Sequence, residues 1–534
     1  MFLSLCLVHD SKDILKSNYV ITAFISIAYS NVMKDKILCW LSGDLTHYFM
    51  LHYLQKNYDC ELYAILDVTN RVKKFFKQQQ IVEFEKLWFF HDHIKTNLQP
   101  DFDYLNKIEE KYDVNIWKLA VNERIFYRFY NFHKFTPNEI LSIDESACRF
   151  FESVFEEVNP KFFITKEPAF HHLVLCHEMC LAKQIITLIP SRPNFNEEVI
   201  ISQIPNKVDF VSTLDNIKPK GRSFEELQKY VEEQALPKKI DYYNKKFGGT
   251  ITHKIAAAYD FFIKSDNSNL HDHYNYFGRT KSKVLLYNVQ EAIKLRYRQY
   301  FIDNNLQKTP DLNVKFIYYP MAMDLERNQL VESPFFNNQT ELIRHIVKSL
   351  PPGYVLYVKE APGQQSRQWR SINEYKDILA IPNVTFFHPS VKNTTFLKNC
   401  SLVVTIGGTS AIEAAVYKKP SIVFSDKGYC ILPSVFRIKE IEMLPKLIKK
   451  ALLTKVNPAD VDKYFTMCKN ESVNFGTFEL EKRQLDAFFH AGNLIDTEIT
   501  ESHILQFLKD NGESYENLAK KHIEKIMQYN SMQK

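Results

Sequence analysis

Short apolar runs alternate with longer amphipathic segments along this chain, which is typical of parallel strands connected by helices. In the N-terminal part, buried strands are predicted at 37–41, 62–66, 161–165 and 185–189, with helical patterns at 44–56 and 169–182. Each strand–helix–strand run is a βαβ unit, so we expect a parallel sheet there. The segment between the two units, residues 70–155, predicts a mostly helical, aromatic-rich insertion.

The alternation starts again after a polar linker, residues 303–313, which contains Pro310. Beyond the linker, strands are predicted at 314–319, 355–358, 384–387, 402–406 and 421–424, with helices at 340–350 and 410–417. Such regularity predicts a second doubly wound α/β domain. Two α/β domains of this kind bind ligands at the carboxyl ends of their strands, so we expect them to face a cleft.

The pattern predicts three parts. We expect an N-terminal Rossmann-like domain over 1–310 with the helical insertion at about 70–155, a C-terminal Rossmann-like domain over 311–455, and a C-terminal helical cap over 456–534. Residues 200–310 are expected to be largely helical. The apolar stretch 19–33 is interrupted by polar residues and is shorter than a bilayer span, so it predicts a buried helix.

Charge and cysteine usage narrow the class of protein. The chain has 68 Lys and Arg against 63 Asp and Glu, and a net charge of +5 spread along the sequence does not indicate nucleic-acid binding. Its nine cysteines, irregularly spaced, favour thiols of a reducing compartment. The N-terminus lacks the basic region and apolar length of a signal peptide. We therefore expect a cytoplasmic protein.

Candidate chemistry gathers where the glycines do. Five of the 13 glycines lie between residues 353 and 428, and two of them begin the run Gly407-Gly408-Thr409-Ser410 between a predicted strand and a predicted helix. Glycines let a ligand approach the backbone, and the N–H groups of a first helical turn favour phosphate. An ordinary turn with a hydroxyl N-cap has the same pattern, and the local sequence does not separate the two.

Two other loops of the same domain are expected at the same sheet edge. Residues 320–326 and 358–363 each follow a predicted strand, so they should lie beside 407–410. Lys359 could neutralise a phosphate, and Glu326 or Glu413 could accept hydrogen bonds from sugar hydroxyls. Each of these charged residues, taken alone, fits a solvated loop equally well. Only the fact that all of them follow strand ends of one sheet favours a ligand site.

The C-terminal half resembles the capsule polysaccharide biosynthesis proteins of bacteria and archaea. The matching text is LPPGYVLYVKE at 350–360, IPNV at 381–384, GTSAIEA at 408–414 and KPSIVF at 419–424, with looser similarity at 63–67, 75–76 and 276–281. The family includes the Kdo transferases of capsule assembly and has the two-domain GT-B fold. The resemblance implies a glycosyltransferase that moves a sugar from a nucleotide-activated donor to a surface or capsule polysaccharide or its lipid-linked precursor, without a metal or other cofactor.

The resemblance also implies a donor site. Its nucleotide-sugar-binding residues would be Glu326, Lys359, Gly407, Gly408, Thr409, Ser410 and Glu413, with a CMP-linked sugar as one option for the donor. This chain departs from the family at Ala361, where the family has a histidine expected to contact the donor phosphate. That departure suits one alternative, a non-catalytic nucleotide- or glycan-binding component of a polysaccharide assembly complex. A second alternative is a GT-B enzyme of different chemistry, such as a nucleotide-sugar epimerase or polyol-phosphate transferase.

An inverting transfer needs a carboxylate that removes the proton from the acceptor hydroxyl. Asp44 follows Gly43 at the end of the first predicted strand, and Asp67 ends the second. Both placements suit a catalytic base that faces the cleft, and both also suit a helix N-cap. Asp44 is the first choice, because Gly43 opens the backbone beside it.

Two further clusters carry alternatives. His171, His172, Cys176, His177 and Cys180 could ligate a metal, but a single helix rarely supplies a zinc site, so a buried cysteine stripe and no metal are expected. The basic run 294–298 fits lipid phosphates, anionic glycan or a solvated helix face.

The expected partners are a nucleotide-sugar donor, a glycan or glycolipid acceptor and no nucleic acid, with peripheral association at the inner face of the plasma membrane or with a polysaccharide export complex.

Overall fold

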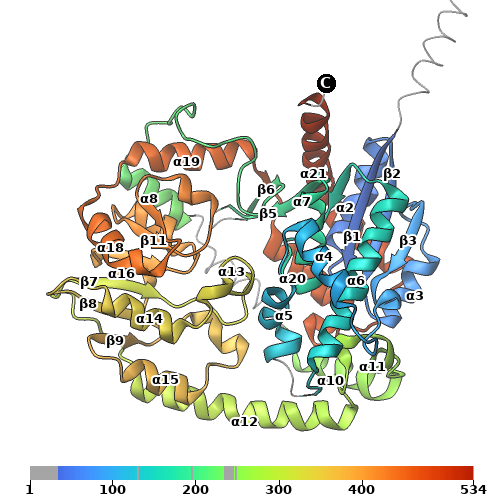
Figure 1. Ribbon diagram of the computed structural model, residues 1–534, viewed down its shortest axis with the longest axis horizontal. Helices are drawn as coiled ribbons and strands as arrows, with labels where there is room; N and C mark the ends of the chain where they lie inside the picture. Colours follow the sequence, from blue (N-terminus) through green and yellow to red (C-terminus); the bar gives the residue numbers. More distant parts are fainter. Residues whose placement is uncertain (1–33, 129–131, 194–196, 234–245, 247–248, 533–534) are drawn as a thin grey trace, which may run out of the picture.

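The computed structural model describes residues 34–128, 132–193, 197–233, 246 and 249–532, and Figure 1 shows two lobes, each built around one sheet. The helix expected at 19–33 lies outside the described residues. Both sheets have the parallel strands and crossover helices of a Rossmann-like domain, so the expected pair of doubly wound domains is confirmed.

The N-terminal sheet has seven strands in the order β13-β6-β5-β4-β1-β2-β3. Its parallel strands are β1 (Asp35–Ser42), β2 (Cys60–Asp67), β3 (Lys86–Phe89), β4 (Phe162–Ile164) and β5 (Ile186–Ser191), and β6 (Glu198–Ser202) and β13 (Val473–Asn474) pair antiparallel. Strands β1 and β2 run in register to their last residues, where Ser42 pairs with Asp67. This register brings the loop after β1 beside Asp67.

Helices cover both faces of this sheet. One face packs against α2 (Thr46–Asn57), α3 (Asn70–Gln78), α20 (Thr477–Phe488) and α21 (Glu501–Met532). The other face packs against α4 (Phe102–Tyr112), α5 (Ile116–Asn122), α6 (Pro137–Val158) and α7 (His171–Ala182). Helix α6 begins with a capping box between Thr136 and Glu139 and has Pro137 at its first position, a sequence signature of a helix start.

The C-terminal sheet has six parallel strands in the order β12-β11-β10-β7-β8-β9. They are β7 (Phe316–Pro320), β8 (Val355–Lys359), β9 (Val384–Phe387), β10 (Leu402–Thr405), β11 (Ser421–Val423) and β12 (Val435–Arg437). Helices α14 (Gln339–Lys348), α15 (Ile372–Leu379) and α18 (Leu444–Leu453) cover one face, and α16 (Asn393–Asn399) and α17 (Ser410–Val416) cover the other.

The expected insertion at 70–155 needs a correction, because it contains β3, which pairs with β2 as a regular strand of the N-terminal sheet. Strand β3 is four residues long and lies at the sheet edge, so it lacks the long apolar run that marks a buried strand. The segment 70–155 is therefore part of the Rossmann-like domain, with helices added around an edge strand.

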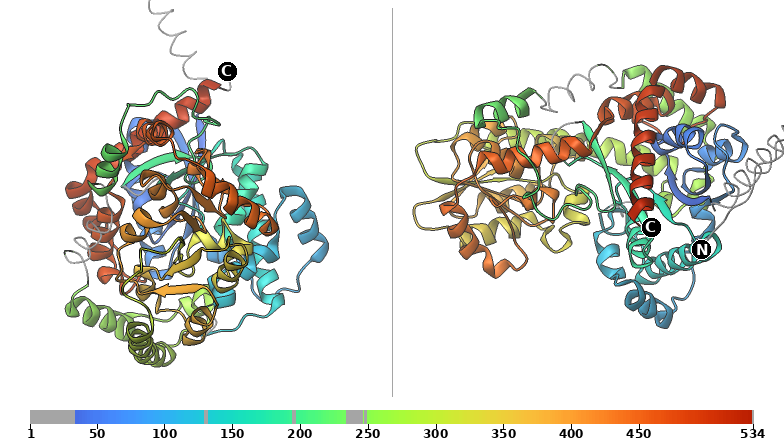
Figure 2. Two further views of the ribbon diagram at one scale, coloured as in Figure 1. Left: turned by 90° about the vertical axis from the view of Figure 1, so that its left-hand side faces the viewer. Right: turned by 90° about the horizontal axis from the view of Figure 1, so that it is seen from above.

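The chain also crosses between the lobes more often than the sequence indicates. Helix α8 (Phe224–Glu233) packs on α17 of the C-terminal lobe, although it lies within the expected N-terminal domain 1–310. In the expected helical extension 456–534, α19 (Pro458–Glu471) packs on the C-terminal lobe, and β13, α20 and α21 complete the N-terminal lobe. Figure 2 shows α21 against the N-terminal lobe from two further directions. Amphipathic patterns predict helices but not the lobe that they cover.

Candidate functional site

A pocket of about 390 Å³ lies between the lobes at the carboxyl ends of both sheets, and we call it the interdomain pocket. Its walls come from Arg124, Glu167, Ala169, Arg192, Pro193 and Asn206 of the N-terminal lobe and from Leu325, Glu326, Arg327, Asn328, Arg367, Gly407, Thr409, Lys427 and Tyr429 of the C-terminal lobe. The ligand cleft that strand topology predicts therefore exists as a measurable cavity.

Cations outnumber carboxylates in the interdomain pocket. Arg327 and Lys427 share Glu332, whose carboxylate lies 2.6 Å from the Lys427 amine, and Arg327 also lies 4.0 Å from Glu167. Arg124, Arg192 and Arg367 have no carboxylate within ion-pair distance in the part of the chain that the structure describes, and the buried Arg124 Nε has no hydrogen-bond partner there.

Burial lowers the pKa of the Arg124 and Arg192 guanidinium groups, so the protein environment opposes their charge. A polyanion such as a nucleotide diphosphate would supply the missing negative charge. Burial also raises the pKa of Glu326, against the opposing effect of the nearby cations.

The sequence-predicted donor residues divide into two groups. Glu326, Gly407 and Thr409 line the interdomain pocket. Lys359 does not line it: its amine is buried at the end of β8 and donates to Asn393 Oδ1 at 2.8 Å, and burial lowers its pKa to about 8. Lys359 therefore lies at the expected end of the strand, but its side chain is buried and does not reach the pocket where the phosphate was expected.

The glycine-rich turn differs from its expected form. A Cβ at Gly407 would overlap the side chain of Ser425, so this glycine is required by close packing. Thr409 stands at the N-cap position of α17 but forms no side-chain cap, so the hydroxyl N-cap, one of the two alternatives that the sequence left open, is not formed. Its hydroxyl donates to Glu413 Oε1 at 2.7 Å. Gly408, Ser410 and Glu413 lie immediately beside the pocket wall without being part of it. The turn thus shapes the pocket mainly through Gly407 and Thr409.

The loops after β7 and β8 are fixed by a buried arginine that sequence reasoning missed. The Arg370 guanidinium lies 2.9 Å from Glu360 and 2.8 Å from Asp324, and it also donates to the carbonyl oxygen of Ala322 at 2.6 Å. Arg370 and Glu360 are fully buried. This ion pair ties the two loops together, and Ala361, which replaces the histidine of the resembling family, donates its N–H to Glu360.

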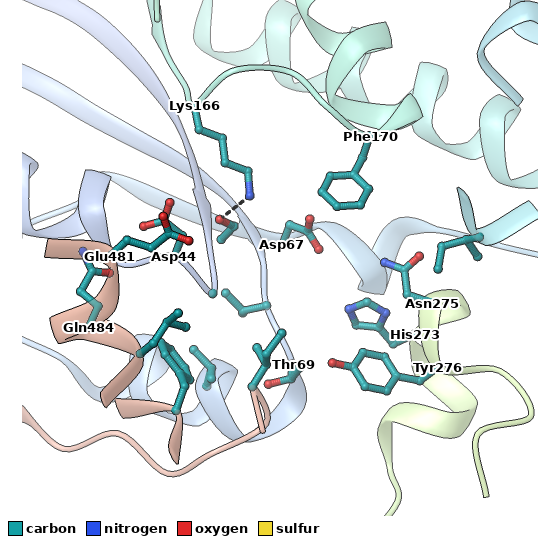
Figure 3. Close-up of a pocket in the computed structure, with 18 of the residues that line it drawn as sticks. Asp44, Asp67, Thr69, Lys166, Phe170, His273, Asn275, Tyr276, Glu481 and Gln484 are labelled. Carbon is teal, nitrogen blue, oxygen red and sulfur yellow. Dashed lines mark hydrogen bonds between the residues drawn. The ribbon is translucent and has the colours of Figure 1, made fainter. Parts of the chain in front are cut away.

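A second cavity of about 400 Å³, the N-terminal pocket, opens at the carboxyl ends of β1, β2 and β4. Figure 3 shows Asp44, Asp67, Lys166, His273 and Glu481 around it. Both carboxylates that the sequence singled out therefore line one cavity. Glu481 belongs to α20, a helix of the C-terminal extension, and nothing in the local sequence indicates that it reaches this site.

Asp67 is held by two histidines. Its Oδ1 lies 3.0 Å from His91 Nε2, and its Oδ2 lies 3.3 Å from His172 Nε2. Burial opposes the charge of this carboxylate, but the two histidine contacts hold its pKa well below the usual range. A carboxylate of such low pKa with both oxygens occupied is a weak proton acceptor.

Asp44 is more available. Its side chain is exposed in the pocket, and one oxygen accepts from the Thr46 N–H at 3.0 Å, just before α2, whose N-cap residue is Leu45. Glu481 lies beside it in Figure 3. Desolvation and the negative charge of Asp44 raise the pKa of Glu481, the direction that suits a group taking up a proton near neutral pH.

The expected cysteine stripe is confirmed, since Cys176 and Cys180 are buried in the core of the N-terminal lobe. His171 and His172 are satisfied by hydrogen bonds, His171 to Asp144 at 2.7 Å. Asp67, His91 and His273 do place candidate ligand atoms within 4.8 Å of one another. However, the His91 and His273 rings are stacked, so they face each other across their planes rather than converge on one point.

One short loop separates the two pockets. In the segment 166–170 after β4, Lys166 and Phe170 line the N-terminal pocket, whereas Glu167 and Ala169 line the interdomain pocket. The Lys166 amine bonds to Ser42 Oγ at 2.9 Å, and Arg327 from the other lobe donates to the Pro168 carbonyl oxygen at 2.7 Å. The loop is thus fixed from both sides, and the pockets are immediate neighbours.

Some of the missed residues had a signal in the sequence. Arg192 directly follows β5, which was predicted at 185–189, and Lys427 lies in the loop after β11. A search for cations at every strand end would therefore have found both residues. Arg124, Arg367 and Arg370 lie in irregular segments or short turns, where pattern gives no position in space.

The structure has two Rossmann-like domains that face a cleft, which is the arrangement expected of a GT-B-like fold. No protein-family model matches the chain, and no curated protein matches its sequence. Solved structures match it distantly: a UDP-GlcNAc 2-epimerase from Methanocaldococcus jannaschii in complex with UDP-GlcNAc and UDP has 11% identity and a TM-score of 0.24, covering 80% of this chain and 98% of its own.

A β-Kdo 2,7 transferase from Thermosulfurimonas dismutans has 12% identity and a TM-score of 0.27, covering 66% of this chain and 87% of its own. It belongs to the class of enzyme that the C-terminal motifs resemble. A UDP-GlcNAc 2-epimerase from Neisseria meningitidis has 10% identity and a TM-score of 0.25, covering 80% and 94%. Because these likenesses are slight, the functional assignment depends on the residues of this chain.

Among the described residues, no helix combines the length and the apolar character needed to cross a membrane.

Proposed function

We propose that the protein is a metal-independent GT-B glycosyltransferase that moves a sugar from a nucleotide-activated donor to a surface glycan or its lipid-linked precursor. The observation that carries the proposal is the pair of pockets on the two sides of the loop 166–170. A transferase must bind two substrates near each other, and two cavities on the two sides of one short loop place the two binding sites side by side.

The donor is assigned to the interdomain pocket. Arg124, Arg192 and Arg367 would bind its phosphates, and they would stabilise the negative charge that develops on the leaving nucleotide. Glu326 lines the same pocket and would accept a hydrogen bond from a ribose or sugar hydroxyl. Fixed cations of this kind supply the charge that a divalent metal supplies elsewhere, so the proposed reaction needs none.

The acceptor is assigned to the N-terminal pocket, where Asp44 is the first candidate for the base. It would remove the proton from the acceptor hydroxyl as that oxygen attacks the anomeric carbon and the bond to the nucleotide phosphate breaks. Glu481 is placed to share or relay this proton. Asp67 remains the second candidate, and its low pKa favours a constant negative charge that would stabilise an oxocarbenium-like centre.

The proposal is tested by measuring thermal unfolding with a panel of nucleoside diphosphates, CMP and the matching nucleosides, because a ligand that binds the native state raises the unfolding temperature. We expect a shift with at least one phosphorylated nucleotide and a smaller one with its nucleoside. Transfer assays with the corresponding nucleotide sugars follow. A chain that binds no nucleotide would contradict the proposal, and sugar isomerisation without transfer would indicate an epimerase.

A further inference from the structure

Helix α12 (Lys281–Asn305) runs along one edge of the molecule from the N-terminal lobe to the C-terminal lobe (Figure 1). Of its 25 residues only Ile302 is buried. Its outer face carries large apolar side chains at intervals of three or four residues, namely Leu286, Val289, Ile293, Tyr297 and Tyr300. This spacing places them in a single stripe along the helix.

A second apolar stripe lies on the neighbouring helix. Helix α10 (Ile251–Tyr259) continues into a π-helical turn, Asp260–Lys264, and it exposes Ile251, Ile255, Tyr259 and Ile263. The nine side chains of the two stripes are each between 52% and 69% exposed. Exposed apolar residues are ordinary when scattered, but nine of them in two stripes, on helices that line the same cavity, are grouped as at an interaction surface.

The charges around these stripes are mainly positive. Of the seven basic residues on the two elements, Lys281 and Arg298 donate to backbone carbonyl oxygens and Lys294 pairs with Glu291. The other four are exposed, namely Lys254, Lys264, Lys283 and Arg296. Their acidic residues are occupied: Asp260 is buried against Arg71 at 2.9 Å, Glu291 pairs with Lys294 at 2.8 Å, and Asp303 pairs with His388 at 2.9 Å. Apolar stripes with flanking lysine and arginine match the headgroup and acyl layers of a bilayer that contains anionic lipid.

A second copy of the chain fits this surface less well. In a twofold dimer the same patch meets itself, which would bring the basic residues of both copies together across the interface. An anionic membrane surface instead complements every part of the patch, since the tyrosines suit the interfacial layer and the aliphatic side chains suit the hydrocarbon beneath it.

The two helices that carry the stripes also line a cavity. A cavity of about 570 Å³, the helical pocket, lies between α10 with its π-helical turn and α12. It shares the wall residues Tyr276, Arg279 and Ile495 with the N-terminal pocket, so the two cavities adjoin. Arg279 therefore lines both the helical pocket and the pocket that holds Asp44 and Asp67.

Arg279 is held in place by its neighbours. Gly278 has φ +71° and lies so close to the Phe132 backbone that a Cβ would overlap it, which fixes the turn before Arg279. The guanidinium lies 5.2 Å from the centre of the Phe132 ring. Within the described residues, no carboxylate lies at ion-pair distance from it, and burial lowers its pKa. Such a cation at the junction suits a phosphate group.

We propose that the α10–α12 face docks on a bilayer containing anionic lipid, and that the helical pocket admits the apolar part of a lipid-linked acceptor whose phosphate lies at Arg279. The membrane surface follows from the exposed stripes and their charges alone. The acceptor class rests on the proposed glycosyltransferase function.

The membrane part is tested by sedimentation of the full chain with vesicles of phosphatidylcholine, with and without phosphatidylglycerol. We expect binding that needs the anionic lipid and falls with added salt. The double variant Leu286→Glu/Ile293→Glu should bind on the order of tenfold more weakly. Leu453→Glu is the control, because Leu453 is an apolar residue, 86% exposed, that lies outside the two stripes at the end of α18 of the C-terminal lobe. Equal binding of both variants, or a wild-type dimer that the double variant dissociates, would overturn the membrane assignment.

The acceptor part is tested with dodecyl phosphate below its micelle concentration, with dodecyl maltoside as the neutral amphiphile. Arg279→Gln should weaken dodecyl phosphate binding on the order of tenfold and leave dodecyl maltoside unchanged. Equal loss for both amphiphiles, or no loss, would overturn the role of Arg279. Nucleotide binding without vesicles is measured in the same samples. If it is absent while vesicle binding follows the prediction, the proposed function fails and the membrane surface stands.

Discussion

Lys166 and Glu167 are consecutive in the sequence, yet each lines a different cavity, Lys166 the N-terminal pocket and Glu167 the interdomain pocket. The loop that carries them is bonded to Ser42 of its own lobe and to Arg327 of the other. The loop is therefore one point of contact between the lobes, alongside others such as the hydrogen bond from Asn337 to Asn122. It connects the assigned donor pocket to the assigned acceptor pocket.

The first prediction concerns the unneutralised cations of the interdomain pocket. Arg367→Gln removes a charge that no carboxylate balances in the described part of the chain, so a phosphate would lose a charge-assisted contact. Nucleotide affinity should fall by about 1.5–3 kcal/mol, measured by calorimetry. The nucleoside should bind both forms equally. Arg344→Gln is the matched control, because Arg344 pairs with Glu341 on the outer surface of α14. An equal loss in both variants would contradict the assignment.

The second prediction concerns Lys359 and the pH dependence of stability. Burial lowers its folded-state pKa from 10.5 to about 8, so between these values the unfolded chain holds more protons than the folded one. The contribution of Lys359 to stability therefore rises with pH across this window, by up to about 3 kcal/mol. Lys359→Met should be more stable than the wild type at pH 7, and the difference should shrink toward pH 10.

Thermal unfolding of both proteins across this pH range measures the effect. Asn393 keeps a second hydrogen bond, from Tyr318 at 3.1 Å, so the variant leaves no unpaired amide oxygen. The same variant tests the original expectation of a phosphate contact, because Lys359→Met should leave nucleotide affinity unchanged if the burial of this residue decides its role. A loss comparable to that of Arg367→Gln would restore Lys359 to the donor site.

The fold was largely predictable from the sequence, and the reason lies in local pattern. Apolar runs such as 402–406 and the capping box at Thr136 depend on neighbours in the chain, so they predict strands and helix starts directly. Edge strand β3 was missed and helix α8 was assigned to the wrong lobe, because their positions depend on distant packing. The strand order that brings Asp44 and Asp67 to one cavity follows from parallel βαβ units.

The side-chain chemistry of the site was less predictable. Lys359 and Thr409 occupy the expected positions on the backbone, but their partners, Asn393 and Glu413, decide where their polar groups point. Glu481 reaches the N-terminal pocket from a helix far away in the sequence. Spacing along the chain predicts which strand end a residue follows, whereas burial and hydrogen-bond partners are properties of the assembled structure.

The third prediction concerns the buried ion pair of Arg370 and Glu360. Arg370→Met leaves the Glu360 carboxylate in a fully buried site without its main partner, so the free energy of unfolding should fall by about 3–5 kcal/mol. Urea denaturation measures this change. The double variant Arg370→Met/Glu360→Met removes both charges and should recover part of the loss. If the double variant loses as much unfolding free energy as the two single variants lose together, or more, the two partners do not compensate each other and the assignment as an ion pair is contradicted.

The last prediction concerns the catalytic base. Asp44→Asn keeps the size of the side chain and its bond to the Thr46 N–H but cannot accept a proton, so turnover should fall by roughly 10²–10⁴ while donor affinity stays the same. Glu481→Gln should cost less if it only assists, and it should shift the acidic limb of the pH–rate profile toward lower pH, because its raised pKa would no longer contribute.

Asp67→Asn separates the two proposed roles within the same pocket. Its oxygens are bonded to His91 and His172, so the variant also disturbs both histidines, and unfolding temperatures must be measured alongside the rates. If Asp67 only stabilises positive charge, Asp67→Asn should slow the reaction without moving the pH–rate profile, since a carboxylate of such low pKa is ionised throughout the working range. A profile that loses its acidic limb in Asp67→Asn and keeps it in Asp44→Asn would reverse the two assignments and make Asp67 the base.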